Sequence, residues 1–93
     1  MSNINIIKKA IIEDKTMNMK RRYRVTHETE KPFKVYDAPD GIYFTRDIAM
    51  AAFDLIVSEL SSGREQCGRF VVKVDEVTKY NDFVCNVKRF ESD

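Results

Sequence analysis

The chain has 93 residues, of which 43% are hydrophobic and 33% are charged, and its net charge is +1. This length fits one domain. The aliphatic and aromatic content excludes a disordered acidic tail, and two cysteines are too few for a disulfide framework. No apolar run approaches the ~20 residues that a membrane-spanning helix needs, so we expect no membrane association.

The N-terminal segment, residues 2–14, predicts a short amphipathic helix. Ile4, Ile7 and Ile11 recur at helical spacing, although β-branched isoleucines are stiff and favour strands. Met17 and Met19 are candidate alternative translation starts. We therefore expect residues 1–16 to be a helical appendage and residues 17–93 to form a single α+β domain.

The same segment does not resemble an export signal. Lys8 and Lys9 interrupt its apolar run, and no small-residue cleavage site follows. We therefore expect a cytoplasmic protein, in a compartment where Cys67 and Cys85 stay reduced.

Residues 20–28 alternate between two faces and predict a half-buried strand. Tyr23, Val25 and His27 fall on one side, and Arg22 and Arg24 fall on the other. A second short strand is predicted over residues 33–37. The sequence Ala38-Pro39-Asp40-Gly41 then predicts a turn, and a brief extended piece follows over residues 42–44.

A long helix is predicted from Arg46 to Ser62. Thr45 supplies the N-cap hydroxyl, Asp47 lies in the first turn, where the helix dipole favours it, and Gly63 ends the helix at the C′ position. The residues expected to form one apolar face are Ile48, Ala49, Ala52, Phe53, Leu55, Ile56 and Leu60.

Residues 69–77 and 82–90 alternate and predict a hairpin with a turn over Thr78–Asn81. This turn would place Cys85 opposite Val74 and leave Cys67 far away, so no intramolecular disulfide is expected. The predicted fold class is α+β, with one long helix packed on an antiparallel sheet of four to five strands, plus the short N-terminal helix.

Few residues suggest chemistry. His27 is either a general base or, the interpretation we favour, a partly buried, hydrogen-bonded strand histidine. Asp37 and Asp40 flank Pro39 and suggest either a hard-cation chelate or ordinary turn carboxylates, which we favour because a calcium loop needs more oxygens. We expect no enzyme, no catalytic residue, no metal and no cofactor.

A basic sheet face is the strongest binding signal in the sequence, although the same pattern also fits a solvated face, or one covered by the N-terminal helix or a second subunit. If the long helix covers the side that carries Tyr23 and Val25, alternation places the cations on the other side, together with two aromatic rings that could stack on bases. The predicted partner- or RNA-binding residues are Lys20, Arg22, Arg24, Lys34, Tyr36, Arg69, Lys73, Lys88 and Phe90.

The helix YFTRDIAMAAFDLIVSEL, followed by the hairpin RFVVKVDEVTKYNDFVCNVKRF, resembles in layout the small accessory proteins of tailed phages. That resemblance implies host-takeover or anti-defence activity in the host cytoplasm, by blocking a host protein or a protein–nucleic-acid complex without catalysis. It carries no motif, so no residue role follows from it.

The expected function is therefore that of a small inhibitory binding protein. The alternative is an RNA-binding regulator that uses the basic face. A third interpretation is a homodimer sealed by the Ile-rich N-terminal helix.

Overall fold

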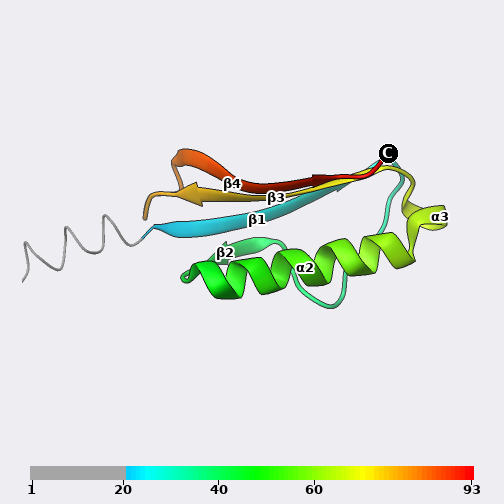
Figure 1. Cartoon of the computed structure of the whole chain (residues 1–93), viewed down its shortest axis with the longest axis horizontal. Coiled ribbons are helices and arrows are strands. Elements are labelled where there is room, and N and C mark those ends of the chain that lie inside the picture. Colours follow the sequence, from blue (N-terminus) through cyan, green and yellow to red (C-terminus); the bar gives the residue numbers. More distant parts are fainter. Residues whose placement is uncertain (1–20) are drawn as a thin grey trace, which may run out of the picture.

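A computed structural model describes residues 21–93 of the chain, which form two layers (Figure 1). One layer is an antiparallel sheet, and the other is the long helix α2 lying along it. In chain order the elements are β1 (Arg22–Thr29), β2 (Gly41–Tyr43), α2 (Arg46–Ser62), α3 (Arg64–Cys67), β3 (Phe70–Val77) and β4 (Phe83–Glu91). The α+β prediction with a four-stranded antiparallel sheet is confirmed for the described residues.

The helix α2 begins and ends where its sequence predicts. The Thr45 hydroxyl accepts a hydrogen bond from the N–H of Ile48 at 3.2 Å, and the Gly63 N–H closes the last turn on the Glu59 carbonyl. Glycine is common after a helix because it tolerates a left-handed backbone, but the φ of Gly63 is −98°, which does not require glycine. A Cβ there would lie 2.4 Å from Cζ of Phe33, so Gly63 leaves room for that ring.

The strand order is β2-β1-β3-β4, and all neighbouring strands are antiparallel. The predicted strands at both ends of the domain are present, with bounds shifted by one or two residues. The predicted hairpin turn is confirmed: Asn81 donates its N–H to the Thr78 carbonyl and adopts a φ of 68°, which closes a three-residue loop.

The core lies between α2 and the two central strands. From the sheet, Val25, Val72 and Val74 are fully buried, and from the helix, Ile56 and Leu60 are fully buried. Burying each such side chain stabilises the fold by roughly 1.5–3 kcal/mol relative to leaving it in water. Alternation along β1 and β3 therefore fixes which face of the sheet meets the helix.

The strand predicted over residues 33–37 is wrong. These residues form a loop that leaves β1 and passes along α2, and the sheet takes its edge strand from β2 instead. The loop is held by α2: the Glu59 carboxylate accepts the N–H groups of Tyr36 and Asp37 at 2.9 and 3.1 Å. This backbone therefore satisfies its donors on a helix side chain and not on a neighbouring strand.

Both cysteines are free. Cys67 is fully buried, and Cys85 is exposed on β4. The predicted helix over residues 2–14 and the appendage over residues 1–16 lie outside the described residues. Within residues 21–93, no helix is long and apolar enough to cross a membrane.

Candidate binding surfaces

The predicted basic face is only partly assembled. Arg22, Arg24 and Lys73 do lie on the sheet, and Arg24 and Lys73 share the face opposite the helix. Arg69 precedes β3, and Lys20 lies outside the described residues. The expected cluster of cations therefore reduces to a few positions on β1 and β3.

The cations of this face are also engaged by the protein's own groups. Arg24 lies 3.7 Å from the Asp75 carboxylate and donates to the Asn81 side-chain oxygen at 3.2 Å. Arg69 lies 3.9 Å from Glu30. The Arg22 guanidinium sits 4.6 Å from the centroid of the Phe44 ring. These contacts reduce the positive potential that the alternation pattern predicts.

Lys88 and Phe90 lie on the opposite side of the sheet from the one expected. Lys88 reaches Asp54 of α2 at 3.7 Å, and its ammonium lies over the Phe53 ring, 4.9 Å from the centroid. Phe90 stacks on the core residue Phe70, with ring centroids 5.6 Å apart. Both side chains therefore belong to the helix side.

A register shift between β3 and β4 explains this difference. Val74 pairs with Lys88 and Asp75 pairs with Asn86, so Val87 is an extra residue, as in a β-bulge. A second register shift, between Glu76 and Val77, makes Val84 an extra residue as well, and Cys85 lies opposite Glu76 and not opposite Val74. Because opposite residues share a face, one extra residue moves the whole second half of β4 to the other side.

Lys34 and Tyr36 are displayed on the loop along α2 and not on the sheet. The Tyr36 ring is 74% exposed, and the Lys34 ammonium lies 5.2 Å from its centroid. The loop holds this pair in place because Glu59 binds the Tyr36 backbone.

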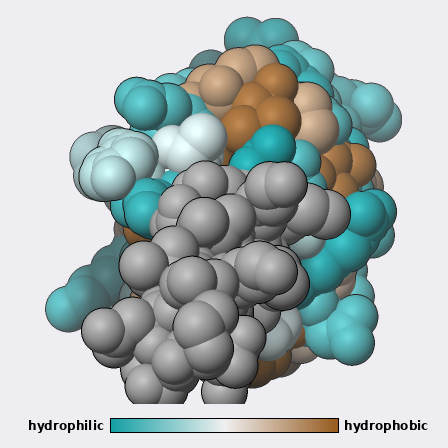
Figure 2. Space-filling view, turned by 90° about the vertical axis from the view of Figure 1, so that its left-hand side faces the viewer, coloured by the Kyte–Doolittle hydropathy of each residue, from teal (hydrophilic) through white to brown (hydrophobic). Residues whose placement is uncertain are grey.

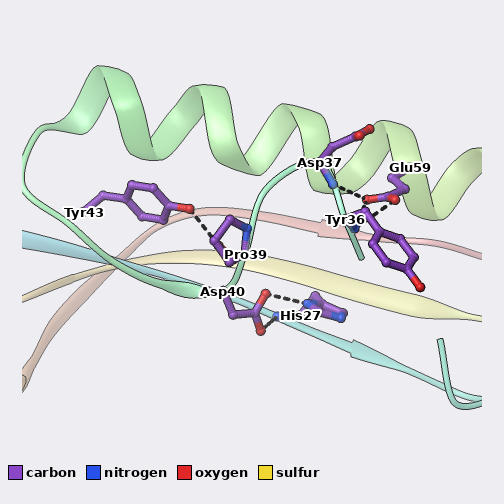
Figure 3. A network of polar contacts seen from close by, with 7 residues as sticks. All are labelled: His27, Tyr36, Asp37, Pro39, Asp40, Tyr43 and Glu59. Carbon is purple, nitrogen blue, oxygen red and sulfur yellow. Dashed lines mark hydrogen bonds and ion pairs between the residues drawn. The ribbon is translucent and has the colours of Figure 1, made fainter. Parts of the chain in front are cut away.

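A polar network fixes the far end of the same loop (Figure 3). The Asp40 carboxylate accepts the His27 N–H at 3.0 Å and contacts His27 Nδ1 at 2.5 Å. The Tyr43 hydroxyl donates to the Pro39 carbonyl at 2.7 Å. Burial, and next the negative charge of Asp40, raise the pKa of Tyr43, which keeps this donor protonated.

The side chains of Asp40, Tyr43 and Glu59 hold the loop through hydrogen bonds to backbone groups. The side chain of His27 is 19% exposed and is held by Asp40, which matches the favoured interpretation of a partly buried, hydrogen-bonded strand histidine. The Asp40 carboxylate accepts the backbone N–H of His27 and contacts its imidazole, and the Glu59 carboxylate accepts two backbone N–H groups of the loop. In the part of the chain that the structure describes, no group of three or more His, Cys, Asp or Glu side chains could hold a metal ion.

The large exposed apolar side chains gather mainly in two places. The first is the outer side of α2, where Ile48 and Leu55 are 56% and 46% exposed; Phe44, which precedes the N-cap Thr45, is 69% exposed. Ile48, Leu55 and the exposed Ala51 recur at helical spacing, and we call these three residues the α2 stripe. Ile48 and Leu55 were predicted to lie on the apolar face that packs on the sheet, but both are exposed, so for these two residues the prediction is wrong.

The second place is the hairpin and β4, where Tyr80, Phe83, Val84 and Phe90 are exposed. Figure 2 looks at the hairpin end and shows an apolar area in its upper part, at the level of this hairpin. Sequence reasoning listed Phe90 but missed Phe83. The signal was present: a strand with one buried side should alternate apolar and polar residues, but Phe83, Val84 and Cys85 are apolar in succession, so apolar side chains must lie on both faces.

No protein-family model, no curated protein and no solved structure matches this chain. Fold and surface together define a small two-layer α+β protein with two exposed apolar areas.

Proposed function

We propose that this chain is a non-enzymatic binding protein that acts by occupying the surface of a protein partner, and that the α2 stripe is its contact surface. The single observation that carries the proposal is the exposure of Ile48, Ala51 and Leu55 on one side of a helix whose other side forms the core. Clustered apolar side chains on a small protein commonly mark an interaction site.

The surroundings of the stripe favour a particular kind of partner. Asp47 and Asp54 are exposed on the same helix. Leu55, at the C-terminal end of the stripe, is one helical turn from Glu59, which binds the backbone of the exposed Tyr36. An aromatic ring beside an apolar stripe with an acidic rim suits a partner whose surface is apolar and rimmed by basic residues.

The resemblance to phage accessory proteins extends this proposal to inhibition. A protein of this size blocks an enzyme or a defence complex by covering its surface, which needs no convergent catalytic groups. The host protein or nucleoprotein complex would then be the partner, in the host cytoplasm.

Affinity capture tests the proposal. The tagged full-length chain is used to capture partners from an extract of the cells that contain it, in parallel with Leu55→Glu and Ile48→Glu. Each variant places a carboxylate in the stripe and is expected to lose the captured partner. Ser61→Glu is the matched control, since Ser61 is exposed on the opposite margin of α2 and receives the same charge. Retention of the partner by both stripe variants, with unchanged circular dichroism, would reject the α2 stripe.

RNA binding is the second candidate, and two lysine–tyrosine pairs favour it. Lys34 lies over Tyr36, and Lys79 lies 5.3 Å from the centroid of the Tyr80 ring, which is also exposed. Exposed rings beside cations stack on bases and attract phosphates. This candidate predicts that capture is lost after nuclease treatment and weakens steeply with salt. Nuclease-resistant capture that is insensitive to salt would reject it.

A further inference from the structure

The strand β4 lies at the edge of the sheet and pairs on one side only. Its ladder runs along β3, and no strand within residues 21–93 lies on its other side. Phe83 is 62% exposed and Val84 is 38% exposed, and Cys85 is exposed beside them. A nine-residue edge strand with unpaired backbone groups is a template for another strand.

Charge is distributed unevenly along this edge. Residues 83–87 carry none, whereas Asp82 precedes them and Lys88, Arg89 and Glu91 follow. Natural edge strands use charges, among other features, to prevent pairing, and the first half of β4 lacks the charges that the second half has. The open segment is therefore bounded by an acidic residue at one end and by basic residues at the other.

The order of charges along β4 is complementary to the same order read in the opposite direction. In an antiparallel pair of two β4 strands with the two-fold axis at Cys85, Phe83 faces Val87 of the partner subunit, and Asp82 faces Lys88 of the partner subunit. The same register brings Lys79 to the level of Glu91 of the partner subunit. Val84 would face Asn86 of the partner subunit, the remaining residues near the axis would be apolar or cysteine, and opposite charges would meet at both ends.

Symmetric registers with the two-fold axis moved by one residue in either direction do not pair opposite charges in this way. Moving the axis to Val84 sets Lys79 opposite Arg89 of the partner subunit, which are like charges. Moving it to Asn86 sets Asp82 opposite Phe90 of the partner subunit and Val84 opposite Lys88 of the partner subunit. Like charges placed directly opposite destabilise a strand pair.

The pairing of β4 with β3 contains two register shifts, which leave Val84 and Val87 as extra residues. Asn86, between them, donates its side-chain amide to the Val74 carbonyl at 3.2 Å, to Asp75 Oδ1 at 2.9 Å and to the Lys88 carbonyl at 3.2 Å. All three acceptors belong to β3 or to β4 itself. We propose that two copies of this chain pair antiparallel along β4 about Cys85, which joins their sheets into one of eight strands.

The register has a chemical consequence. Directly opposed residues of an antiparallel pair have Cα atoms ~4.5–5.5 Å apart, and a disulfide needs ~4.4–6.8 Å. Cys85 of one copy would therefore lie within bridging distance of Cys85 of the partner subunit. Diamide would oxidise the two thiols to a disulfide and would itself be reduced to the hydrazine, taking up the two electrons and two protons.

Sedimentation equilibrium of the full-length chain under reducing conditions tests the association, and a charge exchange tests the register. We expect a concentration-dependent dimer. Lys88→Asp is expected to weaken it roughly tenfold, because it sets two pairs of like charges opposite each other. Asp82→Lys is expected to do the same, and the double variant Asp82→Lys with Lys88→Asp is expected to regain most of the association. Circular dichroism controls for loss of the Lys88–Asp54 contact.

Diamide cross-linking gives an independent measurement. The wild type and Cys67→Ser are expected to form a covalent dimer, and Cys85→Ser is not, because Cys67 is fully buried. Leu55→Glu should leave the dimer unchanged, so this inference and the proposed function can fail separately. A monomer at all concentrations, no rescue in the double variant, or no cross-link through Cys85 in a protein that does associate would each overturn the proposal.

Discussion

At the scale of single residues, the glycine at position 63 is explained by packing and not by its position at the end of a helix. The position follows a helix, yet its backbone is not left-handed, and the Phe33 ring fills the space where a Cβ would lie. Gly63→Ala is expected to lower the free energy of unfolding by roughly 1–3 kcal/mol through overpacking, measured by urea denaturation.

A double-mutant cycle with Phe33→Leu checks that cause. The smaller side chain gives the new methyl group room, so the alanine should be less destabilising in that background. An equal effect of Gly63→Ala in both backgrounds would show that the Phe33 ring is not responsible.

Glu30 provides a prediction about pH. The N–H of Arg69 donates to its carboxylate at 3.0 Å, and this hydrogen bond, followed by the charge of Arg69, lowers the pKa of Glu30 below its ordinary value. The unfolded chain therefore binds the proton more tightly. The stabilisation is complete above the ordinary pKa of Glu30 and is lost as pH falls through the lowered value.

Two variants separate the causes. Because the backbone hydrogen bond contributes most, the pKa of Glu30 in Arg69→Gln should stay below its ordinary value, as measured by NMR titration of the carboxyl carbon. Glu30→Gln should remove this part of the acid dependence of stability. A return of the pKa to its ordinary value in Arg69→Gln would assign the effect to the guanidinium instead.

At the scale of elements, the long helix could be predicted to the residue, and the loop before β2 could not. The signals for α2 are local, since Thr45 and Gly63 adjoin its ends. The loop depends on Glu59, which is more than twenty residues away in the chain and binds the backbone of Tyr36 and Asp37. Alternation over residues 33–37 cannot report a contact of that kind.

The same distinction explains the errors in the candidate site. Alternation predicts faces correctly along β1 and β3 but fails in β4, whose pairing with β3 has two register shifts; the shift at Val87 reverses the side chains that follow it. It moved Lys88 and Phe90 to the helix side. The exposure of Ile48 and Leu55 could likewise not be predicted from the sequence, because both fit the apolar face of the helix. The width of the sheet decides how much of that face is covered.

Removing the Glu59 carboxylate should release the loop. Glu59→Ala is expected to speed hydrogen exchange at the amides of Tyr36 and Asp37, because both donors lose their acceptor, while the amides of β3 change little. Glu65→Ala on the exposed surface of α3 is the matched control. Unchanged protection of the two amides would mean that Glu59 does not hold the loop.

At the scale of the whole molecule, the core and the binding surfaces are separate. The fully buried side chains come from β1, β3, α2 and Cys67, while the side chains of the α2 stripe are exposed and β4 is the edge strand of the sheet. Figure 1 shows α2 and β4 in different layers. Substitutions at either surface should therefore alter association with little loss of stability. Composition and charge gave no sign of this separation, because a net charge of +1 averages over both surfaces.

Removal of residues 1–16 distinguishes the two routes to a dimer. Among the described residues, the apolar cluster that forms the core spans residues 23–87, so the shortened chain is expected to unfold cooperatively in urea. If β4 joins the two copies, the shortened chain keeps its concentration-dependent mass in sedimentation equilibrium and still cross-links through Cys85. If the Ile-rich N-terminal segment seals the interface, the shortened chain becomes a monomer. A folded monomer in this experiment would favour the N-terminal route and reject pairing along β4.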